Sequence, residues 1–171
     1  RINNDIFINL NDAGPYHTRF IKKICKPFKR KFLLSISGWG DADMINFYDH
    51  NDKFIEPLAA KKHPVGDYLS LVAKTYDANY VIPFSSFHEY QREDSVWANK
   101  YVTPIHEYKN GFHKKLNFIE PFTFVDSLKD DNFKSLNLKK NKFKVKKPEQ
   151  FGDNWSDILD KNDKKIIFDY F

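Results

Sequence analysis

A short apolar run at residues 5–10 ends just before the carboxylate of Asp12, and a Gly14–Pro15 pair follows. The run holds β-branched and aromatic residues without glycine or proline, which predicts a buried strand. Proline suits the first turn of a helix, because its missing N–H costs nothing there. We therefore predict a strand, a turn and a helix, with Asp12 at the carboxyl end of the strand.

The same alternation of patterns continues along the chain. Residues 16–26 place Phe20, Ile21 and Ile24 between lysines at helical spacing, and residues 65–76 carry the apolar stripe Val65, Leu69, Val72, Ala73 and Tyr76. Runs at residues 32–36 and 80–84 predict two further buried strands, and residues 118–125, interrupted by Pro121, predict an edge strand. Strand, helix and strand within about 30 residues predict a parallel pair and an α/β fold.

Charge and composition divide the 171 residues in two. The net charge is +5, but residues 129–147 alone carry +6, so the remainder sums to −1. We predict an α/β domain over residues 1–128 and a lysine-rich segment with a C-terminal tail over residues 129–171. Because the basic character belongs to one segment, nucleic acid is not the expected partner.

Cellular context follows from what the sequence lacks. The chain has no run of about 18 apolar residues, which predicts no membrane span. It shows no secretory signal, and its single cysteine, Cys25, has no partner for an internal disulfide. Cys25 falls on the apolar side of the first helix and is expected in the core. A cytoplasmic protein is expected, although a chain that opens on Arg1 is also consistent with a fragment or a processed form.

Two side chains that follow predicted strands are candidate metal ligands. Asp12 follows the first strand and His88 the third, and parallel strands bring their carboxyl ends to one edge of a sheet, where open α/β sheets bind ligands. Imidazole and carboxylate groups are the usual protein ligands of zinc and iron. The alternatives are that Asp12 caps the helix or closes an Asx turn, and that His88 is an ordinary surface residue.

A glycine-rich loop at residues 37–43 follows the second strand at the same edge. Trp39 there, with Phe87 after the third strand, is a candidate pocket residue, and Asp41 and Asp43 are candidate ligands of a hard cation. The alternative is an ordinary glycine-rich connection, since glycine is common in turns. The site predicted from the residues therefore comprises Asp12 and His88 for metal, and Trp39, Asp41 and Phe87 for the substrate pocket.

Several short motifs, taken in their order along the chain, resemble motifs of metallo-β-lactamase-fold proteins. Residues 7–12 resemble the strand that ends in their bridging-metal aspartate, and residues 34–40 with 46–49 resemble the next strand and its loop. Residues 80–87 resemble a later strand with a Pro-Phe pair. Residues 119–125 resemble, more weakly, a proline-centred segment further along the family's sequence. The closest resemblance is to the lactamase-fold part of CMP-N-acetylneuraminate hydroxylase-like proteins, and it spans about residues 6–125.

The resemblance implies the second half of an αββα sandwich, because this chain lacks the His-x-His-x-Asp-His motif of the family's first half. It also implies one or two zinc or iron ions held by Asp12 and His88, and a small anionic or nucleotide-sugar-like substrate. The first half would come from another segment or chain, or the protein is a metal-poor relative. The Cys and His ligands of a Rieske cluster are absent, so hydrolysis is the expected chemistry.

A second function class remains open beside the hydrolase. The chain would then be a metal-free binding module that holds an anionic partner through the lysines of residues 129–147.

Overall fold

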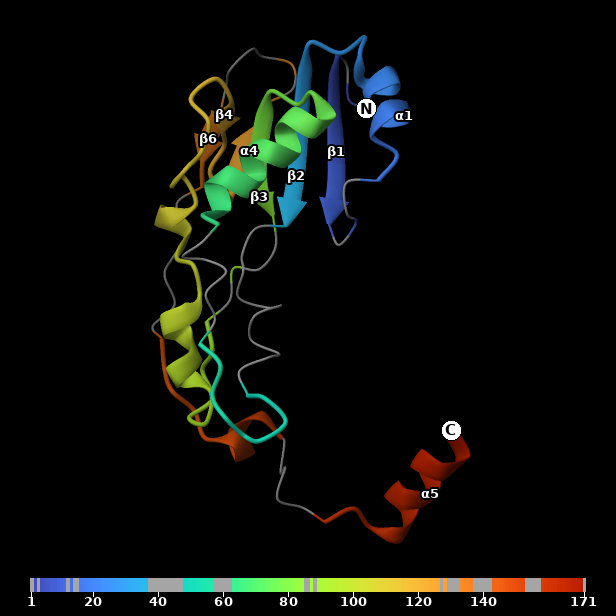
Figure 1. Ribbon diagram of the computed structural model, residues 1–171, viewed down its shortest axis with the longest axis vertical. Helices are drawn as coiled ribbons and strands as arrows, with labels where there is room; N and C mark the ends of the chain where they lie inside the picture. The colour runs from blue at the N-terminus through green and yellow to red at the C-terminus, as the bar shows by residue number, and fades with distance from the viewer. Residues whose placement is uncertain are drawn as a thin grey trace. The chain divides into compact units, whose positions relative to one another are not determined.

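The structure is a computed structural model (Figure 1). It describes residues 2, 4–11, 13, 16–36, 48–56, 63–84, 87, 89–126, 128, 133–136, 143–152 and 158–170, and every statement below concerns these residues. The chain divides into two compact units. The first unit comprises residues 1–88 and 100–140, and the second comprises residues 89–99 and 141–171.

The first unit is built on a four-stranded parallel sheet. Its strands are β1 (Asp5–Asn11), β2 (Arg30–Ile36), β3 (Tyr80–Phe84) and β4 (Asn117–Phe118), and they lie in the order β1-β2-β3-β4. Every neighbouring pair is parallel, so the arrowheads of β1, β2 and β3 in Figure 1 point the same way. The predicted α/β class and the predicted parallel pairing are confirmed.

Two helices connect these strands and cover one face of the sheet. The helix α1 (Thr18–Cys25) links β1 to β2, and α4 (Val65–Tyr76) lies between β2 and β3. All five residues of the predicted α4 stripe are buried, and they pack in one cluster with Ile8, Leu33 and Val81 from the three strands. The sequence periodicity of α4 therefore identified its buried face correctly.

The predicted apolar side of α1 is buried only in part, and the predicted burial of Cys25 is confirmed. Phe20 is 66% exposed and Ile24 is 47% exposed, whereas Cys25 is buried in the cluster and Ile21 packs against it. The apolar residues form one broad face of this helix, and tertiary packing decides which flank of that face is buried. The helix packs against α4 through the side that carries the small Cys25 side chain.

Aromatic residues form a ladder across the opposite face of the sheet. Phe7 stacks on Phe32 at 4.6 Å and Phe32 on Tyr80 at 4.7 Å between ring centroids, following the strand register. Phe133 adds edge and tilted contacts to Phe32 and Tyr80 at 6.4 and 5.6 Å. Helices therefore cover one face, and an aromatic side chain from outside the parallel sheet packs on the other.

Phe133 belongs to a small antiparallel ladder of β5 (Thr123–Val125) and β6 (Phe133–Ser135). Because β5 precedes residue 128 and β6 follows it, this ladder crosses the domain boundary predicted after residue 128. The single edge strand predicted over residues 118–125 is wrong, because this stretch is divided between β4 and β5. The division falls at Pro121 and Phe122, where Phe122 has a φ of 60° that an extended strand does not allow.

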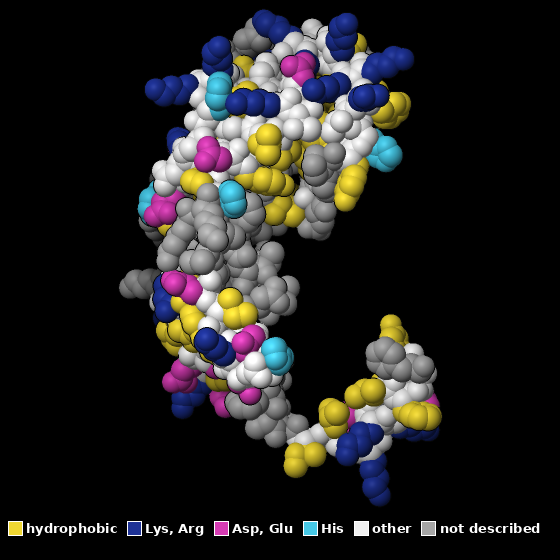
Figure 2. Space-filling model, in the orientation of Figure 1, with side chains coloured by type: hydrophobic (Ala, Val, Ile, Leu, Met, Phe, Trp, Pro, Cys, Tyr) yellow, Lys and Arg dark blue, Asp and Glu magenta, His cyan; other side chains and the backbone are white. Residues whose placement is uncertain are grey.

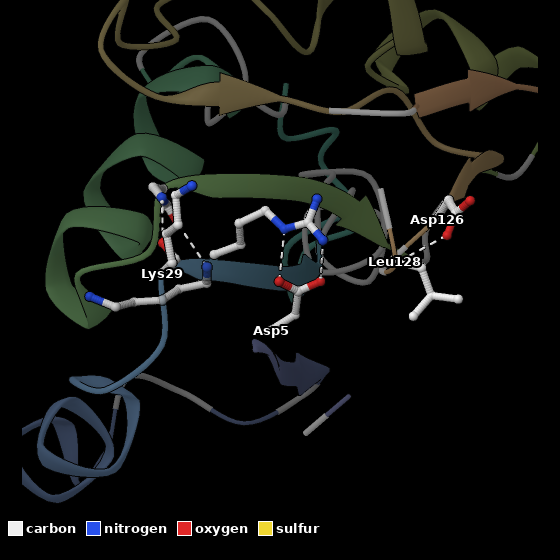
Figure 3. A network of polar contacts seen from close by, with 7 residues as sticks. Asp5, Lys29, Asp126 and Leu128 are labelled. Carbon is white, nitrogen blue, oxygen red and sulfur yellow. Dashed lines mark hydrogen bonds and ion pairs between the residues drawn. The ribbon is translucent and has the colours of Figure 1, made fainter. Parts of the chain in front are cut away.

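A buried ion pair links the first residues of β1 and β2. Arg30 donates from Nε and NH2 to the two carboxylate oxygens of Asp5, both at 2.7 Å (Figure 3). The two residues are register partners and both are buried. The basic run at residues 22–31 was expected to be a solvated helix end. A solvated position is wrong for Arg30, because the pairing of its strand with β1 buries its side chain.

The second unit contains little regular structure. It holds most of the 3₁₀ helix η1 (Val96–Tyr101), the 3₁₀ helix η3 (Pro148–Phe151) and the helix α5 (Lys161–Tyr170). Asn99 exchanges two hydrogen bonds with the backbone of Tyr90 at 2.7 and 2.8 Å. In η1 Ala98 is buried, whereas Trp97 is exposed.

Three further observations concern the described helices. Every residue of the C-terminal helix α5 is exposed. Within the part of the chain that the structure describes, no helix combines the length and apolar character needed to cross a bilayer. The short 3₁₀ helix η2 (Ile105–Glu107) completes the described elements.

Candidate functional site

The carboxyl edge of the parallel sheet is where the sequence places its candidate site. The register pairs Asn9 with Leu34 and Leu34 with Ile82, so the carboxyl-terminal ends of β1, β2 and β3 lie side by side. Asp12 follows the end of β1 by one residue, and His88 follows the end of β3 by four. The parallel pairing on which the metal-site prediction depends is therefore confirmed, while the positions of Asp12 and His88 stay predictions.

The structure places only part of the predicted site. Asp12, Trp39, Asp41 and His88 lie outside the described residues, so their side-chain positions remain predictions. Phe87 is described, and it is half-buried against the core cluster of the first unit.

The end of β1 carries a backbone irregularity that sequence reasoning missed. The register passes from Asn9–Leu34 to Asn11–Ser35, so Leu10 has no partner and the strand bulges. Asn11 then takes a φ of 35°, and its N–H donates to Oδ1 of Asn9 at 3.1 Å. Bulges turn the chain and redirect side chains. The signal in the sequence is the pair of asparagines, which tolerate such conformations and bond their own backbone.

An aromatic cluster joins Phe87, which follows β3, Phe122, which follows β4, and Tyr108, which precedes β4. The Phe87 ring lies 5.8 Å from Tyr108 and 5.6 Å from Phe122, between centroids. Tyr108 is fully buried, whereas Phe122 is about half exposed and holds its left-handed φ. A bulky residue in this conformation is unusual and strained, and such strain concentrates at functional sites. The cluster forms an apolar wall that the sequence showed only at Phe87.

The other histidines and the cysteine have ordinary surroundings. His106 is 81% exposed and lies 3.8 Å from Glu107, while the backbone N–H of His113 donates to Oγ of Ser70 at 2.8 Å. His50 is exposed in a turn, with its Nε2 3.0 Å from the side-chain amide of Asn51. Burial raises the pKa of the Cys25 thiol, so this group stays protonated at neutral pH and packs as an apolar residue.

The described residues alone do not assemble a metal centre. Among them, no three His, Cys, Asp or Glu side chains gather closely enough to hold an ion. Comparison with known proteins gives no match to a protein-family profile, a curated protein or a solved structure. The candidate site is thus defined by its position, at the carboxyl edge of an open parallel sheet, by the bulge before Asp12 and by the aromatic wall at Phe87.

Proposed function

We propose that the chain is the second half of a metal-dependent hydrolase with an αββα, metallo-β-lactamase-like sandwich. The observation that carries this proposal is the parallel pairing of β1, β2 and β3, whose carboxyl ends precede Asp12 and His88 in the sequence. Two further features support it. Helices α1 and α4 cover one face of the sheet, and Phe133 of a second, antiparallel ladder packs on the other.

Each residue of the site has a definite role in this proposal. Asp12 and His88 are the metal ligands, and carboxylate with imidazole is a donor set that suits zinc or non-haem iron. One or two bound ions would supply an activated water and polarise the substrate. Trp39, Asp41 and Phe87 shape the pocket for a small anionic substrate, such as a nucleotide sugar.

Two ligands are fewer than a catalytic zinc site needs, since such sites use three protein ligands. The remaining ligands would come from the segment or chain that carries the first half of the fold. This chain alone is therefore expected to bind metal weakly and to show no robust hydrolase activity.

Cobalt titration tests the ligand assignment, because Co²⁺ reports its coordination by visible absorption. The wild-type chain should show weak but saturable bands, and Asp12→Ala and His88→Ala should each weaken binding at least about tenfold. His106→Ala is the matched control, since that imidazole is exposed and paired only with Glu107 among the contacts given above.

Two results would overturn the proposal. Binding that both substitutions leave unchanged would remove Asp12 and His88 as ligands. Tight stoichiometric uptake of zinc by this chain would contradict the half-fold reading, and Asp41, Asp43 and His50 would be the first residues to examine as additional ligands.

The second candidate function is a metal-free module that binds an anionic partner through residues 129–147. One observation favours it: Lys134, Lys144, Lys146 and Lys147 are all exposed. Replacing the last three with glutamine should abolish salt-sensitive binding to a polyanion such as heparin if this segment is the site, because counterion release scales with the charges neutralised. Unchanged binding would eliminate this candidate.

A further inference from the structure

The amino edge of the parallel sheet collects three connections that are far apart in the sequence. Because β2, β3 and β4 run the same way, the segments that precede them all arrive at this edge, opposite the candidate metal site. These segments are residues 26–29, residues 77–79 with the last turn of α4, and residues 113–116. All of them belong to the first unit and all are described.

These connections carry a concentration of lysines. Figure 2 shows dark-blue side chains gathered at the top of the first unit, the end from which the strand arrows of Figure 1 start. The exposed lysines there, with those of the neighbouring α1, are Lys22, Lys23, Lys26, Lys29, Lys74, Lys114 and Lys115. The charge that the sequence appeared to confine to residues 129–147 therefore has a second concentration that only the topology assembles.

Little negative charge offsets these lysines. Asp77 is the acidic residue of the three connecting segments, and Nζ of Lys31 pairs with its carboxylate at 2.5 Å. Asp5 lies at the same edge, but it is buried and bonded to Arg30. The described residues of the three connecting segments thus carry a net positive charge.

We propose that this amino edge, defined by the seven lysines above, binds the phosphate backbone of a nucleic acid. Lysine is a compact point charge well suited to phosphate oxygens. The lysines approach from three adjacent connections, with strands spaced about 4.8 Å apart, so they are spread along an edge instead of converging on one small anion. A polymer with regularly repeated phosphates fits that distribution.

The surroundings of these lysines favour nucleic acid over an anionic membrane. Surfaces that bind membranes combine basic residues with apolar side chains that enter the bilayer. No exposed large hydrophobic residue of the described chain belongs to residues 26–29, 77–79 or 113–116, whereas α1 exposes Phe20 and Ile24 beside Lys22 and Lys23. The distinction therefore rests on the lysines of the three connecting segments. The edge also offers no exposed aromatic ring for base stacking in these segments, so binding should depend on the backbone and not on base sequence.

Fluorescence anisotropy with the full chain tests the proposal. The probes are a labelled single strand of about twenty nucleotides and the corresponding duplex, each titrated between about 50 and 200 mM salt. The triple variant Lys26→Gln, Lys29→Gln, Lys115→Gln should bind at least about tenfold more weakly, with a salt slope shallower by about 2 to 3, as expected for three lost phosphate contacts. The variant Lys161→Gln, Lys164→Gln, Lys165→Gln on α5 loses the same charge and should retain the wild-type slope.

Several outcomes would overturn the proposal. These are no binding by the wild-type chain, equal losses in the two triple variants, and binding to phosphatidylserine vesicles without binding to either nucleic acid. A loss confined to a variant of Lys144, Lys146 and Lys147 would move the site to the lysine-rich segment and also overturn it. Circular dichroism checks that the variants are folded, and if the triple variant unfolds, Lys26→Gln and Lys115→Gln are compared singly, each with an expected slope change of about 1.

Discussion

Asp5 and Arg30 illustrate how one contact between residues 25 positions apart joins two strands. Their side chains are 2% and 7% exposed, and the guanidinium bonds both carboxylate oxygens. Burying two charges is costly, so such a pair adds little stability compared with an apolar pair of similar volume. Removing one partner is a different matter, because it leaves the other charge buried without compensation.

Asp5→Ala should therefore lower the free energy of unfolding by about 3–5 kcal/mol, measured by urea denaturation. The double variant Asp5→Ala, Arg30→Met should recover much of this loss, because no buried charge is left unpaired. The control is Glu120→Ala, which breaks the exposed pair of Lys109 and Glu120 and should cost less than about 1 kcal/mol. Equal costs for the Asp5 and Glu120 variants would contradict this account of the buried pair.

The raised pKa of the Cys25 thiol predicts how the free energy of unfolding changes with pH. Burial raises the pKa of its thiol, and the nearby Lys31 opposes this to a smaller extent, so the folded state holds the proton more tightly than the unfolded state. The free energy of unfolding should then be insensitive to this group at neutral pH and should fall as the pH rises above the unfolded thiol pKa of about 8.5.

Urea denaturation between neutral and alkaline pH measures this effect. The difference in unfolding free energy between wild type and Cys25→Ala should shrink as the pH rises through the alkaline range. Tyr76→Phe is a useful comparison, since burial also raises the pKa of the Tyr76 hydroxyl and its contribution falls at higher pH. A difference between wild type and Cys25→Ala that stays constant with pH would show that the thiol does not titrate differently in the two states.

At the scale of elements, β6 changes the expected role of the lysine-rich segment. The segment was expected to contribute little to the fold, and single Lys→Ala substitutions between Lys139 and Lys147 are still expected to shift stability by only about ±0.5 kcal/mol. Phe133 lies in the same segment, yet its ring contacts Phe32 and Tyr80 on the sheet. A small ladder thus brings one part of the segment onto the second face of the sheet.

Phe133→Ala should lower the free energy of unfolding by about 1–3 kcal/mol, less than the 3–5 typical of a fully buried phenylalanine because Phe133 is half-buried. Phe143→Ala, an exposed residue of the same type in the same segment, is the control and should change stability by no more than about 0.5 kcal/mol. Both are measured by urea denaturation. If the two substitutions cost the same, the ladder does not stabilise the sheet.

For the whole molecule, the exposed apolar residues predict association. If the chain is half of a sandwich, some of its apolar surface should be free to meet a partner. Phe20 and Ile24 of α1 are among the exposed large hydrophobic residues, and Phe84 at the end of β3 is partly exposed. Apolar surface left in water favours association when a complementary surface is present.

Sedimentation velocity should therefore show self-association of this chain through α1. Phe20→Ser with Ile24→Ser should reduce both self-association and the fluorescence of an apolar dye. These side chains are exposed, so their replacement should change stability little. A monomer without dye-detectable apolar surface would contradict the prediction and favour a complete single fold.

The sequence by itself determined the elements whose signals are local. Strands β1, β2 and β3 lie where apolar runs predicted them, and α4 has its predicted bounds and buried face. The parallel pairing of these strands also followed, because strand–helix–strand units leave few alternatives. Periodicity works here because each element carries one strong pattern over its own length.

Only the tertiary structure decided the features that depend on distant partners. Which flank of the broad apolar face of α1 is buried was set by its packing on α4. The pairing of Asp5 with Arg30 and the wall of Tyr108 and Phe122 around Phe87 required strands and loops to meet. The lysines of the amino edge are brought together in the same way, since charge summed along a sequence carries no information about which loops a parallel sheet places side by side.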